Sequence, residues 1–183
     1  MVRSKLNLPN LLTIIRIILA PLVFIAIFSG GRWMGIGSVL FGIGAITDWM
    51  DGYLARKHKL VTGFGQFADP VADKLLSGFA LAGVAAAGYI IVIPVIAIIL
   101  RDVIMTSFRL WGISKGVKIL PSKLAKTKTL LEMGSLILIM VYASIGGNPV
   151  GYRFGSVAIS LVGILAWITM ADYFWKNRGL LFQ

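Results

Sequence analysis

DWMDGYLARKHKLVTGFGQFADPVAD, residues 48–73, holds four of the seven acidic residues in the chain: Asp48, Asp51, Asp69 and Asp73. Strongly apolar sequence flanks this stretch on both sides. Ionisable side chains in such surroundings are costly and tend to be functional. We therefore expect the four carboxylates to lie at the edge of a membrane, or just inside it.

The spacing of the four carboxylates places them on two helix faces. Asp48 and Asp51 are three residues apart, and Asp69 and Asp73 are four apart, so each pair shares one face of a helix. Where two such faces meet, unpaired carboxylates repel one another. One or two divalent cations would remove this repulsion, and all-oxygen ligation favours Mg²⁺ or Mn²⁺.

The same stretch matches the pattern D-x2-D-G-x2-A-R-x8-G-x3-D-x3-D at every fixed position. The matching residues are Asp48, Asp51, Gly52, Ala55, Arg56, Gly65, Asp69 and Asp73. This pattern resembles the signature of the CDP-alcohol phosphatidyltransferases, membrane enzymes that displace CMP from a CDP-linked lipid with an alcohol. The small residues among these positions leave room for a bulky group to approach the backbone.

The resemblance implies a role for each matched residue. The four aspartates would hold Mg²⁺ or Mn²⁺, as two ions, and Asp73 would also be the general base toward the alcohol. Contacts with the CDP-lipid would come from Gly52, Ala55, Arg56 and Gly65. Thr62 matches a position that contacts the CDP group in relatives; its alternative role is to cap the third helix.

Two other interpretations of the aspartates follow from the residues alone. A buried charge cluster would pair them with Arg56 and Lys74 and only hold helices together. An ion-coupled transporter would use similar carboxylates as a proton or ion relay. Such a transporter is expected to carry repeated halves and midplane helix breaks, and neither is visible in the sequence.

Composition favours an all-α integral membrane protein. The chain has 183 residues, 58% of them hydrophobic, and a mean hydropathy of +0.89, above ordinary soluble usage. We expect a single domain, 1–183. The net charge of +11 comes from basic residues that fall between apolar runs. This pattern indicates anionic headgroups and phosphate substrates rather than nucleic acid.

Six apolar stretches are long enough to cross a bilayer, because about 20 helical residues cover about 30 Å. The predicted spans are 9–29, 34–57, 65–88, 91–114, 127–146 and 151–174. Arg16 and Pro21 interrupt the first of them, which argues against a cleaved signal peptide.

The distribution of Lys and Arg predicts the topology. With six spans and both termini inside, the inner loops and tails hold twelve basic residues and the outer loops hold two, Arg32 and Arg153. This asymmetry agrees with the positive-inside rule. The aspartates then lie at the inner ends of the second and third spans, so the polar active site faces the cytoplasm. We expect a multi-pass protein of a bacterial-type plasma membrane.

A second resemblance concerns the branch of the family that makes phosphatidylglycerophosphate from CDP-diacylglycerol and sn-glycerol 3-phosphate. NLPNLLTIIR near the N-terminus and FADPVADKLL are similar to segments of that branch. The resemblance places Asn10 and Thr13 near the nucleotide. Alternatively, Asn10 caps the first helix and Arg16 extends its charge to lipid headgroups.

Four basic residues are candidates for the acceptor phosphate: Arg101, Arg109, Lys126 and Lys128. RDVIMTSFR and AKTKTLLEM resemble the matching segments of the same branch, except that Asp102 stands where Glu is usual. Arg and Lys suit a phosphate group. The alternative is that they are positive-inside charges, with Asp102 paired to one of the arginines.

The acceptor alcohol itself depends on the resemblance. A basic pocket argues for a phosphorylated alcohol, hence sn-glycerol 3-phosphate. Sibling enzymes use inositol phosphate, serine or phosphatidylglycerol, and these stay open as alternatives. The resemblance also implies a homodimer among membrane lipids.

Overall fold

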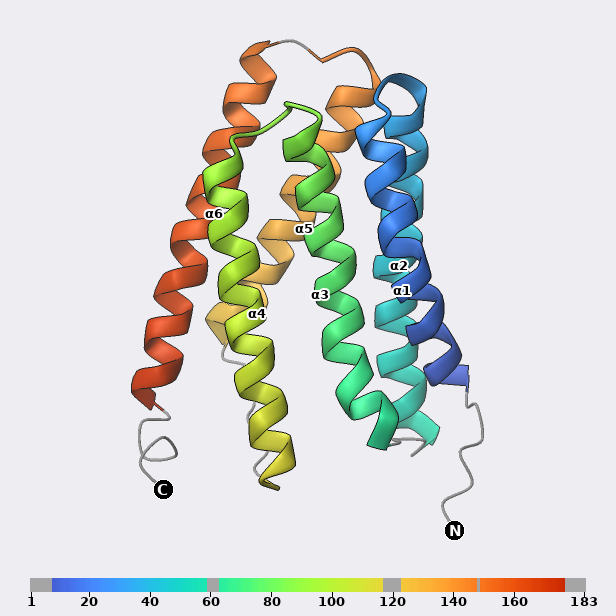
Figure 1. Cartoon of the computed structure of the whole chain (residues 1–183), viewed down its shortest axis with the longest axis vertical. Helices are drawn as coiled ribbons and strands as arrows, with labels where there is room; N and C mark the ends of the chain where they lie inside the picture. Colours follow the sequence, from blue (N-terminus) through green and yellow to red (C-terminus); the bar gives the residue numbers. More distant parts are fainter. Residues whose placement is uncertain (1–7, 59–62, 117–122, 148, 177–183) are drawn as a thin grey trace. The chain divides into compact units, whose positions relative to one another are not determined.

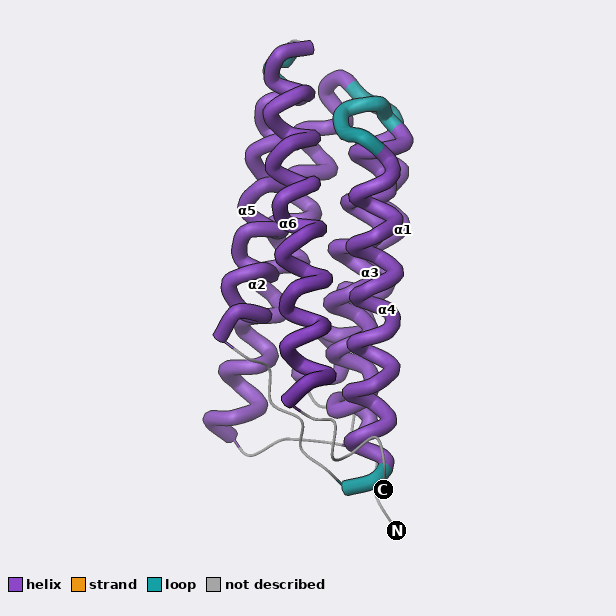
Figure 2. The backbone as a smooth tube through the Cα atoms, turned by 90° about the vertical axis from the view of Figure 1, so that its left-hand side faces the viewer, coloured by secondary structure: helices purple, strands orange, loops and turns teal. Residues whose placement is uncertain are grey.

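The computed structural model describes residues 8–58, 63–116, 123–147 and 149–176. Those residues form six α-helices (Figure 1): α1 Leu8–Phe28, α2 Gly31–His58, α3 Gly63–Ala86, α4 Val92–Ser114, α5 Lys123–Ser144 and α6 Pro149–Lys176. The all-α class predicted from the sequence is confirmed. Each helix begins and ends within four residues of its predicted range. Figure 2 traces the backbone through these helices and the turns that join them.

The chain divides into two compact units, Met1–Ala87 with α1 to α3 and Gly88–Gln183 with α4 to α6. In the first unit, α1 packs against both α2 and α3. Ile27 of α1 is fully buried there. A methyl group added at Gly37 of α2 would lie 2.8 Å from Ile27 Cγ1, and one added at Gly83 of α3 would lie 3.1 Å from Ile27 Cβ. Glycine at both positions therefore lets the helices approach closely and fixes the face that α1 presents to its neighbours.

In the second unit, α6 packs against both α4 and α5. Its core contains one fully buried aliphatic side chain from each helix: Ile98 on α4, Leu136 on α5 and Ile159 on α6. Close packing of such residues gives the unit a continuous apolar interior. The polar residues described below lie within that interior, so their surroundings limit access of water.

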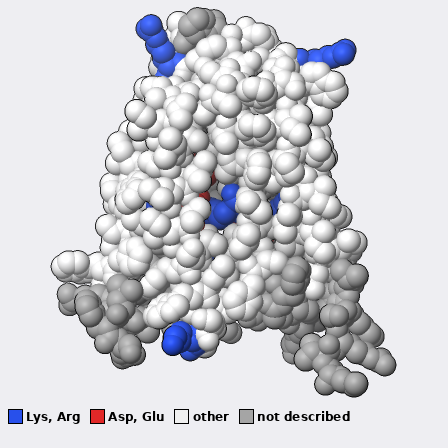
Figure 3. Space-filling view, viewed as in Figure 1, with Lys and Arg blue, Asp and Glu red and all other residues white. Residues whose placement is uncertain are grey.

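Two of the described helices, α1 and α6, contain segments long and apolar enough to cross a membrane. The segments are Asn10–Phe28, with mean hydropathy 2.7, and Val150–Lys176, with mean hydropathy 2.0. Large apolar side chains are widely exposed on the described helices, for example Ile93 at 76% and Leu138 at 71%. In the space-filling view of Figure 3, most of the visible described surface carries neither acidic nor basic residues.

Candidate functional site

Side chains from α1 contact two of the carboxylates of the first unit, Asp48 and Asp69. Asp48 lies in the second half of α2, and Asp69 lies in the second turn of α3. Thr13 Oγ1 donates a hydrogen bond of 2.5 Å to Asp69 Oδ1. Arg16 Nη1 donates one of 2.5 Å to Asp48 Oδ1. Because Thr13 and Arg16 are three residues apart on one helix face, α1 orients carboxylates from both neighbouring helices.

Arg16 forms an ion pair inside the protein rather than at a lipid headgroup. Its side chain has 0% exposure, and its guanidinium nitrogen lies 2.5 Å from Asp48. The interpretation in which Arg16 extends its charge to headgroups is therefore wrong. Asn10 is also buried, and it lies inside α1, which begins at Leu8. A cap residue lies just before the first helical residue, and Asn10 lies two residues after it. Its alternative role as the cap of that helix is therefore wrong.

The described carboxylates influence one another electrostatically. Each contact with α1 uses only one oxygen of its carboxylate. The negative charges of Asp69 and Asp73 both act on Asp48. The Asp48 side chain is 40% exposed. The Asp73 side chain is 24% exposed, with Lys74 Nζ at 3.7 Å. The acidic groups are thus accessible to a polar ligand, and like charges from two helices act on one another.

This donor set fits a hard divalent cation in its chemistry. Carboxylate oxygens from α2 and α3 are the ligands that Mg²⁺ and Mn²⁺ prefer. Among the described side chains, no three of His, Cys, Asp and Glu are grouped closely enough to hold a metal. The side chain of Asp51, the fourth member of the predicted set, is outside that described part. In the described part of the chain, Asp48, Asp69 and Asp73 therefore do not form a metal-binding group by themselves.

Several predicted contacts of the CDP-lipid lie at the edge of what the structure describes. The backbones of Gly52, Ala55 and Arg56 belong to the last turns of α2, while the side chains of Ala55 and Arg56 are outside the described part. Thr62 is outside the described residues altogether. Gly65 is buried in the first turn of α3. The predicted roles of these residues therefore rest on the sequence pattern alone.

In the second unit, a buried polar network joins all three helices. Arg101 and Asp102 of α4 are each 5% exposed, and Lys128 of α5 is 0% exposed. Arg101 Nη1 donates to Asp102 Oδ1 at 2.7 Å. Lys128 Nζ lies 3.0 Å from Asp102 Oδ1 and 3.2 Å from Oδ2. One carboxylate therefore serves two cations from neighbouring helices.

Helix α6 holds the other side of the Arg101 guanidinium. Nη2 donates to Thr169 Oγ1 at 2.9 Å, and Nε donates to the backbone carbonyl of Ala166 at 3.1 Å. Thr169 Oγ1 donates in turn to the same carbonyl at 2.7 Å. Each nitrogen of the guanidinium thus donates a hydrogen bond, and the plane of the group is fixed.

Glu132 completes the charge balance of this network. It lies one helical turn after Lys128 on α5, and its Oε2 is 2.5 Å from Lys128 Nζ. Its side chain is 1% exposed, and neither oxygen has a well-oriented hydrogen-bond donor among the described residues. We treat the contact as an ion pair because of the short distance. Two cations and two carboxylates leave the network without net charge, which makes such deep burial tolerable.

The other two predicted acceptor residues lie outside this network. Arg109 is half-buried and lies eight residues beyond Arg101 on α4, about 12 Å along the helix. Lys126 is exposed in the first turn of α5. Within the described residues, neither forms an ion pair. The structure therefore divides the four basic residues into two neutralised cations, Arg101 and Lys128, and two cations that have no carboxylate partner in the described part of the chain.

Sequence reasoning did not assign Glu132 or Thr169 to any site. Glu132 is the only acidic residue of α5, and a lone charge in an apolar helix is itself a signal of a buried partner. Thr169 gave no such signal, because a threonine in an apolar helix also bonds to its own backbone. The spacing of Lys128 one turn before Glu132 is the pattern that could have predicted their pairing.

Known proteins match nearly the whole chain. The model of a family described as CDP-alcohol phosphatidyltransferase matches residues 6–175. Several bacterial relatives carry the name CDP-diacylglycerol–glycerol-3-phosphate 3-phosphatidyltransferase. The relative from Rickettsia felis is 34% identical over 173 residues, which are 94% of this chain and 96% of the relative.

Two further relatives of that name differ in coverage. The protein from Sodalis glossinidius is 31% identical over 184 residues, covering 98% of this chain and 99% of its own length. The protein from Yersinia enterocolitica is 38% identical over 138 residues, covering 73% of this chain and 76% of its own length. The similarity thus extends through both units of the structure.

Proposed function

The chain belongs to the CDP-alcohol phosphatidyltransferase family, and we propose that it transfers the phosphatidyl group of CDP-diacylglycerol to sn-glycerol 3-phosphate. The products are phosphatidylglycerophosphate and CMP. One observation carries the proposal: Asp48 and Asp69 of the family pattern, from two helices, are both held by α1. The relatives named for this reaction cover both units. Family membership favours an enzyme over the ion relay of a transporter.

In the proposed reaction, a hydroxyl oxygen of glycerol 3-phosphate attacks the phosphatidyl phosphorus of the CDP-lipid. The new P–O bond replaces the bond to the CMP phosphate, and CMP leaves. Mg²⁺ or Mn²⁺, bound as two ions by Asp48, Asp51, Asp69 and Asp73, would neutralise the pyrophosphate charge. Asp73 takes the proton of the attacking hydroxyl as general base. Such a reaction depends mainly on positioning and charge stabilisation.

The residues around the aspartates position the donor. Arg16 and Thr13 fix one oxygen each of Asp48 and Asp69, which limits rotation of the carboxylates. Gly52, Ala55 and Gly65 leave space for the nucleotide beside the helices, and Arg56, Thr62, Asn10 and Thr13 contact the CDP group. These nucleotide contacts are inferred from the family pattern and the matching segments.

The basic residues of the second unit serve the acceptor phosphate in two ways. Arg109 and Lys126 have no carboxylate partner among the described residues, so they make the direct charge contacts. Arg101 and Lys128 are held in place by Asp102, Glu132 and Thr169, and in this proposal they support the contacts with the acceptor phosphate from within the helices. A set of fixed and unpaired cations favours a phosphorylated alcohol over serine.

Arg109→Ala tests this assignment. Phosphatidylglycerophosphate formation by the purified variant should show a KM for glycerol 3-phosphate raised about 10- to 150-fold, because a charge-assisted bond contributes roughly 1.5–3 kcal/mol. The KM for CDP-diacylglycerol should stay nearly unchanged. Lys176→Ala is the matched control, since Lys176 is an exposed cation paired with Asp172. If Arg109→Ala raised only the KM for CDP-diacylglycerol, Arg109 would belong to the nucleotide site.

We further propose that the protein is a single-domain, multi-pass membrane enzyme with six spans. Both termini and the aspartates lie on the cytoplasmic side of a bacterial plasma membrane, and the enzyme acts as a homodimer. The support is the distribution of basic residues, twelve at or beyond the predicted inner ends of the helices and two, Arg32 and Arg153, at the predicted outer ends. Two of the six helices pass a length and hydropathy test on their own.

Cysteine labelling tests the topology, and the chain has no native cysteine to interfere. A cysteine introduced by Lys118→Cys should be protected from a membrane-impermeant thiol reagent added to intact cells. Arg32→Cys, in the predicted outer turn, should be labelled under the same conditions. The opposite pattern, with position 118 labelled and position 32 protected, would reverse the proposed orientation.

A further inference from the structure

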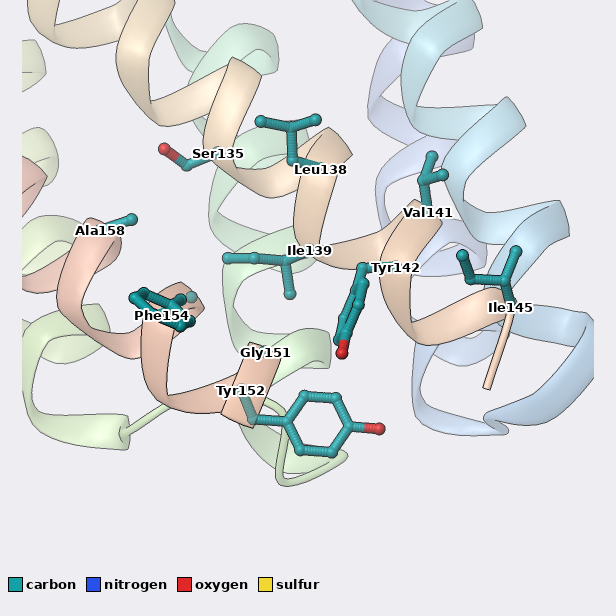
Figure 4. Close-up of a pocket in the computed structure, with 11 residues that line it drawn as sticks. Ser135, Leu138, Ile139, Val141, Tyr142, Ile145, Gly151, Tyr152, Phe154 and Ala158 are labelled. Carbon is teal, nitrogen blue, oxygen red and sulfur yellow. The ribbon is translucent and has the colours of Figure 1, made fainter. Parts of the chain in front are cut away.

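An apolar groove runs between α5 and α6 in the second unit. Its volume is about 530 Å³, and apolar atoms form most of its surface. Figure 4 shows Ile139 between the two helices and Phe154 beside α6, with the rings of Tyr142 and Tyr152 toward the end where the helices are joined. The proposed reaction uses none of these residues.

The length of the groove along α5 is similar to the thickness of one membrane leaflet. Its lining extends from Ser135 on α5 to Ile145, the first residue after that helix, which is ten residues or about 15 Å along the helix axis. The hydrocarbon core of a bilayer is about 30 Å thick. A groove that starts at the α5–α6 turn therefore reaches to about the middle of the bilayer, which is the span of one acyl chain.

The rim of the groove has the character of a membrane interface. The Tyr152 ring packs edge to face against Tyr89, with ring centres 4.9 Å apart, and against Tyr142 at 6.4 Å. The Tyr152 hydroxyl donates to the backbone carbonyl of Gly147 at 2.8 Å. Tyrosine is enriched at the level of lipid headgroups, with its ring in the apolar layer and its hydroxyl toward water.

The small residues of this region are already covered, which argues against a second copy of the chain as the occupant. Small residues four apart let membrane helices pack together, and Gly151 and Gly155 have that spacing. A methyl group added at Gly151 would overlap the Tyr142 ring, and one added at Gly155 would lie 3.0 Å from Ile139. Helix α5 thus occupies the face that a second copy would need.

A second groove lies between α6 and the segment 88–91, which directly precedes α4. Its volume is about 590 Å³, and Tyr152 lines both grooves. The serine hydroxyls that line this second groove bond within the protein. The Ser156 hydroxyl accepts from the Ile91 backbone N–H at 3.2 Å, and the Ser160 hydroxyl donates to the Ser156 carbonyl at 2.7 Å. The exposed cation Arg153 also lines this groove. The groove therefore carries a positive charge that can pair with a phosphate.

We propose that the first turns of α6 form a binding site for anionic phospholipid of the leaflet at the α5–α6 end. Acyl chains lie in the two grooves, and Arg153 contacts the headgroup phosphate. Both grooves are apolar, they share Tyr152, and the charge lies near the rim. These features match a molecule with apolar chains and a negatively charged head.

Native mass spectrometry of the purified protein tests the site, with mixed micelles of phosphatidylglycerol or phosphatidylcholine of equal chain length as the probe. Ala158 lines the α5–α6 groove, so Ala158→Phe should fill it and lower the retained lipid about tenfold or more, because buried methylenes lose their contacts. Ala171→Phe is the matched control, since Ala171 is exposed on α6 and lines neither groove. Leu138→Trp fills the groove from an exposed α5 position and replaces Ala158→Phe if that variant fails to fold.

The headgroup contact is tested separately. Arg153→Gln should lower the preference for phosphatidylglycerol over phosphatidylcholine about tenfold, whereas Arg32→Gln, an exposed arginine in the other unit, should leave it unchanged. Equal lipid retention by the groove variants and their control would overturn the site. Loss of a dimer in the Ala158→Phe variant, with lipid retention intact, would assign the groove to a second copy instead.

Discussion

Asp69→Asn is expected to abolish turnover, and an excess of a metal chelator is expected to do the same to the unaltered enzyme. The substitution keeps the shape of the side chain and an oxygen for the Thr13 hydroxyl, which donates to Asp69 at 2.5 Å. It removes the negative charge that a divalent cation requires. Initial rates of CMP release, with and without added Mg²⁺, measure both effects.

Two comparisons make this prediction specific. Asp73→Asn, which alters the proposed base, should lower kcat by about 10²–10⁴-fold, and disturbed metal ligation should add to that loss. Asp172→Asn removes an acidic group from a surface pair with Lys176 and should leave the rate unchanged. Full turnover in chelator, or an active Asp69→Asn variant, would contradict metal binding by the aspartates.

Asp102→Ala is expected to give the largest loss of stability of any charge substitution in the second unit. It would leave Arg101 and Lys128 buried without the carboxylate that they share. Breaking a buried pair by removal of one partner costs about 3–5 kcal/mol. We expect a lower yield of folded protein and a lower midpoint of thermal unfolding in detergent.

Graded variants separate this effect from general damage to the fold. Thr169→Val removes one hydrogen bond to Arg101 and should cost about 0.5–1.5 kcal/mol. Thr169→Ser keeps the hydroxyl and should unfold close to the original midpoint. Asp172→Ala breaks only the surface pair and should cost less than about 1 kcal/mol. An Asp102→Ala variant as stable as the Asp172→Ala variant would show that the network does not stabilise the unit.

The helices and the aspartate pattern could be predicted from the sequence because both depend on local spacing. Apolar runs bounded by glycine, proline and charged residues marked the six helices. The i,i+3 and i,i+4 spacing marked the shared faces of Asp48 with Asp51 and of Asp69 with Asp73. Neither inference needed to know which helices are neighbours.

The pairing of Arg16 with Asp48 could not be predicted, because these residues are 32 apart in the chain. An arginine in an apolar run can extend to headgroups or pair inside the protein, and only the packing of α1 against α2 decides between the two. The same ambiguity applied to the basic residues of the second unit. Lys126 and Lys128 look alike in sequence, yet one is exposed and the other has 0% exposure.

The role of Thr169 shows a further limit of sequence reasoning. Its bond to Arg101 joins residues 68 apart, and a threonine in an apolar helix carries no sign of such a partner. Glu132 was visible as a lone charge, but its partner within the same helix explained its presence only after burial was known. Contacts between distant, chemically ordinary residues therefore need the tertiary structure.

The proposed function is tested most directly by CMP release from CDP-diacylglycerol with a panel of acceptors, using purified protein and Mg²⁺. The acceptors are sn-glycerol 3-phosphate, inositol phosphate, serine and phosphatidylglycerol. We predict the highest kcat/KM with glycerol 3-phosphate, together with formation of phosphatidylglycerophosphate and loss of both products in Asp69→Asn. A higher kcat/KM with another acceptor would contradict the assigned substrate, and no CMP release with any acceptor would contradict the proposed reaction.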